Sequence, residues 1–154
     1  MAPRSRIEEE LMAFQVKDTI DIEAGAEAIF AVATDYESYP DWNPEVKGVE
    51  VKAKDDEGRA TEVEWQVDAR IRTVRYTLAY DYSGAPDSYS WELLEGDIKS
   101  LTGSYSFDEF DDITEVSYET ELDPGFPVPG LLRRQGEKQL KKSALDKLKS
   151  RVES

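Results

Sequence analysis

The sequence predicts an α+β fold in which a curved antiparallel sheet of about seven strands wraps around one long C-terminal helix. Apolar and polar residues alternate in successive runs between Val49 and Leu122, which is the pattern of half-buried strands. Turn-forming stretches separate these runs at short intervals, as they do in a meander. The end of the chain changes to a helical spacing, and this is the only long helix available to cover the sheet.

The chain is expected to begin with a strand and two short helices. The run Phe14–Ile22 alternates and predicts the strand. Asp18 falls in phase with its apolar residues, and we expect a bulge that turns this side chain to water. The stretch 26–36 has a compact apolar cluster typical of a helix, and a short second helix is expected to end near Pro40.

The strands that follow share one apolar face, which is rich in tyrosine and tryptophan. Its residues are Val49, Val51, Ala53, Val63, Trp65, Val67, Val74, Tyr76, Leu78, Tyr80, Tyr89, Trp91, Leu93, Leu101, Gly103, Tyr105, Phe107, Val116, Tyr118, Thr120 and Leu122. The parity of the apolar positions changes across residues 69–72, so a turn is expected there. In a meander, this turn, residues 95–99 and residues 123–129 must lie at the same end of the sheet.

The final helix is expected from about Pro129 to Val152. Its apolar stripe comprises Leu140, Ala144, Leu148 and Val152. Projecting this stripe backward at about 100° per residue places Glu137 near its centre, facing the sheet. Gly136 is unusual inside a helix. It indicates either space beside an inward Glu137 or a bend that lets Glu137 swing out and pair with Lys141.

Composition excludes several classes of function. The 34 acidic and 19 basic residues give a net charge of −15, which disfavours binding to nucleic acids and anionic membranes. The chain has no cysteine and no histidine, so thiol chemistry and the commonest metal ligands are absent, and no metal or cofactor is expected. No apolar run reaches membrane length. Residues 1–11 are interpreted as a polar extension that lacks the apolar core of a signal peptide. Residues 12–154 are expected to form a single domain. The protein is expected to be cytoplasmic and either a monomer or a weak dimer.

Three stretches carry a resemblance to a known family. They are the pattern D-x-x-x-Y-P-x-W at residues 35–42, the block WELLEGDIKSLTGSYSF, and the closing LDPGFPVPGLLRR. Together they resemble the polyketide cyclase/dehydrase and coenzyme-Q-binding branch of the START-like (Bet v 1-like, SRPBCC) superfamily, over nearly everything from Phe14 onward. The resemblance implies a helix-grip fold with a ligand cavity between sheet and helix. Tyr36, Tyr39 and Trp42 would close one end of that cavity as a structural plug.

The implied cavity would be lined mainly by the inward residues of the sheet, and we expect a volume of roughly 300–1,000 Å³. The candidate ligand-binding residues are Trp65, Val67, Tyr76, Leu78, Tyr80, Tyr89, Trp91, Gly103, Tyr105, Phe107, Tyr118, Phe126, Glu137 and Leu140. The mouth is expected at the end that holds the 69–72 turn. Its rim would comprise Arg70, Arg72, Asp97 and Lys99, with Phe126 as a lid.

The function predicted from these features is binding or carriage of a hydrophobic small molecule, such as a polyketide, an isoprenoid quinone or a lipid. The alternatives are a polyketide aromatase/cyclase or dehydratase and a protein-interaction module. Ring closure needs a group that moves protons, and the inward residues of the sheet offer no carboxylate or histidine. Glu137 is therefore the single candidate for catalysis, and binding is preferred.

Overall fold

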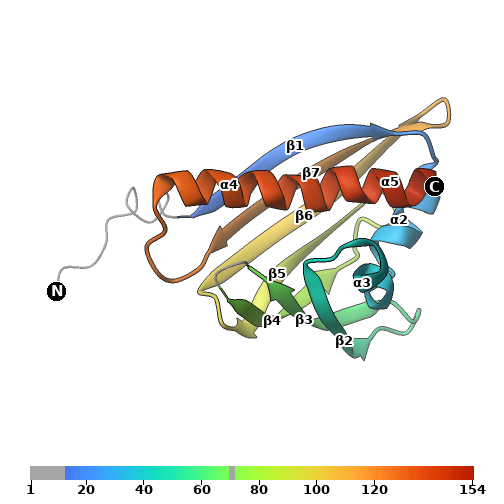
Figure 1. Ribbon diagram of the computed structural model, residues 1–154. Coiled ribbons are helices and arrows are strands. Elements are labelled where there is room, and N and C mark those ends of the chain that lie inside the picture. Colours follow the sequence, from blue (N-terminus) through green and yellow to red (C-terminus); the bar gives the residue numbers. More distant parts are fainter. Residues whose placement is uncertain (1–12, 70–71) are drawn as a thin grey trace.

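The computed structural model of the protein describes residues 13–69 and 72–154. Residues 1–11, expected to form a polar extension, and Arg70, expected at the rim of the cavity, lie outside the described residues. The predicted fold class is confirmed. One antiparallel sheet of seven strands, in the order β1-β7-β6-β5-β4-β3-β2, curves around a long C-terminal helix (Figure 1).

The strands follow the predicted alternation. They are β1 (Phe14–Ile22), β2 (Val46–Lys54), β3 (Ala60–Asp68), β4 (Thr73–Asp81), β5 (Ser88–Gly96), β6 (Ser100–Phe110) and β7 (Ile113–Asp123). From β2 to β7 each strand pairs with the next, and β1 then joins β7. The first and last strands of the sheet are therefore β1 and β2. The pairing of β2 with β3 is irregular, with register shifts near Gly48 and Ala53.

The helical segments cover one face of this sheet. They are α2 (Ala26–Ala33), the 3₁₀ turn η1 (Tyr36–Ser38), α3 (Tyr39–Trp42), α4 (Gly130–Lys141), the π-helical turn η2 (Lys142–Asp146) and α5 (Lys147–Glu153). The last three form one continuous helix that crosses the sheet, while β2, β3 and β4 curl around below it (Figure 1). The expected span of about Pro129 to Val152 is thus confirmed.

The short second helix, expected to end near Pro40, is α3, which ends two residues later at Trp42. Pro40 lies in the first turn of α3, where its fixed φ and missing N–H are tolerated. The expected bulge at Asp18 is absent, because β1 pairs with β7 without a register shift. Asp18 stays in phase with Val16 and Ile20, at the flank of the helix. Its carboxylate there pairs with the Lys141 ammonium at 2.6 Å.

Two clusters of buried side chains form the core. The first lies between α2, α5 and strands β1, β6 and β7, and it contains the fully buried Ile29 and Leu148. The second lies under the curled strands β2 to β4 and includes Val63. Tyr80 and Trp91 pack against both clusters. The aromatic side chains of the sheet therefore stand where the two parts of the core meet.

Candidate functional site: a cavity between sheet and helix

A cavity of about 150 Å³ lies between the aromatic face of the sheet and the C-terminal helix. Strands β3 to β7 contribute Trp65, Val67, Tyr76, Leu78, Tyr80, Tyr89, Trp91, Tyr105 and Tyr118, and the helix contributes Leu140, Ser143 and Ala144. The segment from η1 to β2 closes the remaining side with Tyr36, Tyr39, Asn43, Glu45 and Val46. The wall is therefore mostly aromatic, with polar groups concentrated where α3 leads into β2.

Hydrogen bonds hold several of the aromatic side chains in place. The Tyr105 hydroxyl donates to the Ala144 carbonyl oxygen at 2.8 Å and so joins β6 to the helix. Trp65 Nε1 donates to the Tyr80 hydroxyl at 3.1 Å, which links β3 to β4. The Tyr39 hydroxyl donates to the Ala33 carbonyl oxygen at 2.6 Å. Such bonds fix the rings and satisfy their polar atoms, so the wall is preorganised.

A short relay of hydroxyl groups anchors η1 to the sheet. The Tyr82 hydroxyl donates to the Ala60 carbonyl oxygen at 2.5 Å, and it lies 2.9 Å from the Tyr36 hydroxyl. A hydroxyl has one proton to donate. Because that of Tyr82 is used by Ala60, Tyr36 must be the donor in the second bond. The Tyr36 ring, which lines the cavity, is held by this bond and packs at a tilt against the Tyr80 ring, with ring centroids 4.6 Å apart.

The tyrosines of the wall stay neutral over the physiological pH range. Burial raises the pKa of Tyr80, Tyr89 and Tyr105 well above the usual value, and it raises the pKa of Tyr118 to about 12. A phenolate would lose its hydration in this apolar space. The Tyr80 hydroxyl, which accepts from Trp65 Nε1, can therefore still donate a hydrogen bond to a ligand, but these side chains are poor proton donors for catalysis.

Glu45 is a functional candidate that sequence reasoning missed. It lies just before β2, and its backbone carbonyl oxygen accepts a hydrogen bond from Asp68 N at 2.8 Å. Its side chain crosses to the helix. One carboxylate oxygen accepts a hydrogen bond from Gln139 Nε2 and the other from Ser143 Oγ, the latter at 3.1 Å. Glu45 is the one carboxylate that lines the cavity among the residues that the structure describes.

Most of the predicted site residues come together in this wall, including every predicted position on β3, β4 and β5. Their role as ligand contacts stays a prediction. The exceptions on β6 have a packing explanation. Gly103 faces the indole of Trp91, which fills the space that a Cβ would need. Phe107 is buried in the core cluster beneath α2 and α5 rather than in the cavity.

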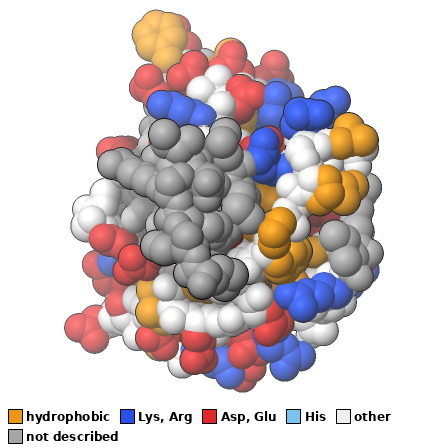
Figure 2. Space-filling model, turned by 90° about the vertical axis from the view of Figure 1, so that its left-hand side faces the viewer, with side chains coloured by type: hydrophobic (Ala, Val, Ile, Leu, Met, Phe, Trp, Pro, Cys, Tyr) orange, Lys and Arg blue, Asp and Glu red, His pale blue; other side chains and the backbone are white. Residues whose placement is uncertain are grey.

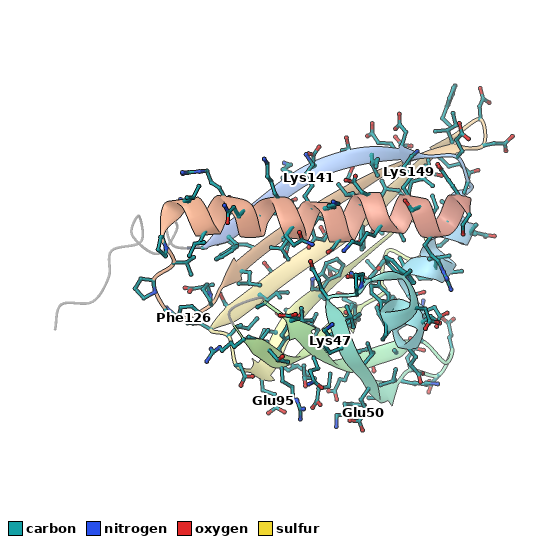
Figure 3. All side chains as sticks on the ribbon, in the orientation of Figure 1. Lys47, Glu50, Glu95, Phe126, Lys141 and Lys149 are labelled. Atoms are coloured by element: carbon teal, nitrogen blue, oxygen red, sulfur yellow. The ribbon has the colours of Figure 1, made fainter. Side chains whose placement is uncertain are left out.

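Phe126 and Glu137 also lie outside the cavity. Phe126 lies in the loop before α4 (Figure 3), and the Arg72 guanidinium lies over its ring at 5.4 Å from the centroid. This contact confirms that the 69–72 turn and residues 123–129 share one end of the sheet. Glu137 faces β1, where its carboxylate accepts a hydrogen bond from Gln15 N at 2.7 Å. The space indicated by Gly136 exists, but it is filled by the ring of Phe14.

The expected rim is likewise not the border of the cavity. Arg72, Asp97 and Lys99 do not line it. The Asp97 carboxylate instead accepts a hydrogen bond from Arg75 N in β4 at 2.9 Å. The face at the start of α4 shows hydrophobic side chains grouped together (Figure 2), and Leu131 is 61% exposed there. Leu131 is not among the residues that line the cavity.

The cavity is smaller than the predicted 300–1,000 Å³ because aromatic rings occupy much of the space under the helix. An apolar cavity of about 150 Å³ is still large enough to bind benzene. A larger hollow of about 580 Å³ lies on the outer face of β1, β7 and β6. Its lining includes Lys17, Thr102, Glu119 and Glu121. Its polar lining makes it a weaker candidate for an apolar ligand.

Within residues 13–69 and 72–154, no helix has the length and apolar character needed to cross a membrane. The same part of the chain contains no group of three or more acidic side chains arranged to hold a metal ion.

Comparisons with known proteins agree with this architecture. The model of the family described as "Polyketide cyclase / dehydrase and lipid transport" matches residues 13–153. No curated protein matches the sequence. A START superfamily protein from Mycobacterium smegmatis is 26% identical, with a TM-score of 0.81 over 90% of this chain and 97% of that one.

Two further solved structures share the fold at lower identity. A protein from Thermus thermophilus is 24% identical, with a TM-score of 0.75 over 90% of this chain and 96% of its own. An aromatase/cyclase from a Streptomyces species is 17% identical, with a TM-score of 0.75 over 92% of this chain and 94% of its own. At these identities the likeness shows the fold alone.

Proposed function

The chain belongs to the polyketide cyclase/dehydrase and lipid transport family, and from this premise we propose that it binds a hydrophobic small molecule in the cavity between sheet and helix. The observation that carries the proposal is the wall itself. Strands β2 to β7 and the long helix border a space whose lining is mostly tyrosine, tryptophan and aliphatic side chains. Concave apolar sites with a few polar groups are typical of small-molecule binding. The ligand classes that fit are polyketides, isoprenoid quinones and lipids, of which a cavity of about 150 Å³ takes one or two rings or a short chain segment.

Binding is preferred over catalysis because the wall offers little for moving a proton. A general acid or base works best with a pKa near the operating pH, and burial moves the tyrosine pKa values away from it. Both oxygens of the Glu45 carboxylate already accept hydrogen bonds from Gln139 and Ser143. We therefore propose that the protein binds or carries its ligand without transforming it. We also propose that it works as a monomer or weak dimer in the cytoplasm.

Titration with naphthalene tests this proposal, since its two fused rings suit the size and polarity of the cavity. Binding is followed by the shifts of backbone amide resonances in a ¹H–¹⁵N NMR spectrum. We expect saturable shifts in the strands that line the cavity. No shift at the solubility limit of naphthalene would contradict the proposal.

Two alanine-to-leucine variants provide a matched pair. Ala144 lines the cavity from the helix, so Ala144→Leu adds bulk to the binding space and should abolish the naphthalene shifts. Ala28 is exposed on α2, so Ala28→Leu makes the same chemical change away from the cavity and should leave binding intact. Equal binding by both variants would place the ligand elsewhere.

A further inference from the structure

The polar end of the cavity is built around a single carboxylate. The backbone of Glu45 is held in place by a hydrogen bond that its carbonyl oxygen accepts from Asp68 N. Its side chain reaches residues 94 and 98 positions away in sequence, Gln139 and Ser143, on the helix. Both partners donate to it, so the carboxylate is fixed in position rather than free to move with solvent.

The fixed carboxylate still has capacity to accept hydrogen bonds. Two carboxylate oxygens offer about four lone-pair positions, and Gln139 and Ser143 use one on each oxygen. Glu45 also contributes to the lining of the cavity. A ligand that enters this space therefore meets an oriented acceptor at one end and aromatic rings on its other sides.

The charges around the cavity oppose an anionic ligand. No lysine or arginine lines the cavity among the residues that the structure describes, and the whole chain carries a net charge of −15. The hydroxyl protons of Tyr39 and Tyr105 are already donated to backbone carbonyl oxygens, so these two lining tyrosines cannot donate to an anion. Among the described residues, a carboxylate next to Glu45 would find no cationic partner in the lining, and its desolvation would be strongly unfavourable.

We infer that Glu45 sets the specificity of this cavity: it selects a neutral, hydroxyl-bearing ligand of one or two rings, whose hydroxyl donates to the carboxylate, and it excludes ligands that carry a carboxylate. This inference rests on the proposed function, because it concerns the same cavity. It narrows the ligand class, since free fatty acids and other organic acids are excluded and phenolic or alcoholic ring compounds are favoured.

Three probes of matched size test the inference, namely naphthalene, 2-naphthol and 2-naphthoate. In the wild type we expect 2-naphthol to bind and 2-naphthoate to bind at least tenfold more weakly. In Glu45→Gln, which preserves the shape and one neutral acceptor, the ratio of the 2-naphthol to the naphthalene affinity should fall about fivefold or more, because a charged acceptor forms the stronger bond. The affinity for 2-naphthoate should rise in the same variant.

Glu62→Gln is the matched control, since Glu62 is exposed on β3, out of phase with the inward-facing Val63 and Trp65, and the substitution changes the net charge equally. It should leave all three affinities at their wild-type values. If naphthalene binds but Glu45→Gln changes no ratio, the inference is wrong and the proposed function stands. If no probe binds the wild type, the proposed function itself fails. If Glu45→Gln does not fold, the affinities of the wild type for 2-naphthol and 2-naphthoate decide the matter. Equal affinities for the two probes would overturn the inference.

Discussion

Replacing Gly103 by alanine tests how tightly the aromatic wall is packed. Gly103 on β6 pairs with Trp91 on β5, and a Cβ at this position would fall well inside the contact distance of the indole ring. The indole cannot easily move away, because Tyr105 and Tyr118 pack beside it with centroid distances of 5.4 and 6.2 Å. Overpacking of a rigid core costs about 1–3 kcal/mol.

The expected magnitude is the difference between two opposing effects. Alanine lowers the entropy of the unfolded chain and is favoured over glycine inside a strand by about 0.5–1 kcal/mol. The net result should be a destabilisation of about 1 kcal/mol, or a fall in Tm of about 2–4 °C for a chain of this length. Urea denaturation followed by circular dichroism measures the first quantity, and a thermal melt measures the second.

Two comparisons decide whether the indole of Trp91 causes the destabilisation by Gly103→Ala. Gly48→Ala makes the same change in β2, where the new Cβ would lie 3.3 Å from the flexible Gln66 side chain, so it should be neutral or slightly stabilising. In a Trp91→Leu background the obstacle is removed, and Gly103→Ala should then stabilise the protein by about 0.5–1 kcal/mol. An equal effect of Gly103→Ala in both backgrounds would refute this reasoning.

Three further predictions follow from the site. Tyr36→Phe removes the hydroxyl that donates to Tyr82, and it should lower the free energy of unfolding in urea by about 0.5–1.5 kcal/mol; no change would mean that the bond has no net effect. The folded-state pKa of Tyr118 is raised to about 12, so its contribution to stability is complete below the unfolded-state pKa of about 10 and is lost as pH rises from about 10 to 12. Tyrosinate absorbance at 295 nm should accordingly appear together with unfolding, and its appearance in the folded state would contradict the burial argument. Glu137→Gln should bind naphthalene and 2-naphthol like the wild type in NMR titrations, because Glu137 lies outside the cavity; weakened binding would show that it contacts the ligand.

The fold could be predicted from the sequence because strand alternation is a local property. Positions such as Trp65, Tyr80 and Trp91 face the cavity as their parity requires, since in a meander with one buried face a shift of one residue would expose the whole set. The break between β3 and β4 followed from the change of parity alone. These predictions needed no knowledge of which strands are neighbours in space.

The polar part of the site could not be predicted from the sequence, for two physical reasons. Glu45 follows Pro44 in a stretch that reads as a connection, and its partners lie on the distant helix. The position of Glu137 was projected from the stripe of Leu140, Ala144, Leu148 and Val152 at a constant 100° per residue. The π-helical turn at Lys142–Asp146 breaks that assumption, because its wider turn rotates the upstream face relative to the downstream one. Glu137 therefore faces β1 instead of the cavity.

The contacts between the C-terminal helix and β1 have a consequence for self-association. A terminal strand normally leaves backbone N–H and C=O groups free to recruit a strand from another molecule. Here Glu137 accepts from Gln15 N, the Lys149 ammonium donates to the Asp21 carbonyl oxygen at 2.6 Å, and Glu153 accepts from Glu23 N at 2.9 Å.

The opposite border of the sheet, strand β2, is irregular. β2 carries the charged side chains of Lys47 and Glu50 (Figure 3) and shifts register near Gly48 and Ala53. Charges and irregular pairing both hinder the docking of a flat strand. The helix that closes the cavity thus also blocks one route to amyloid-like stacking, and loss of its docking would expose a template for aggregation at β1.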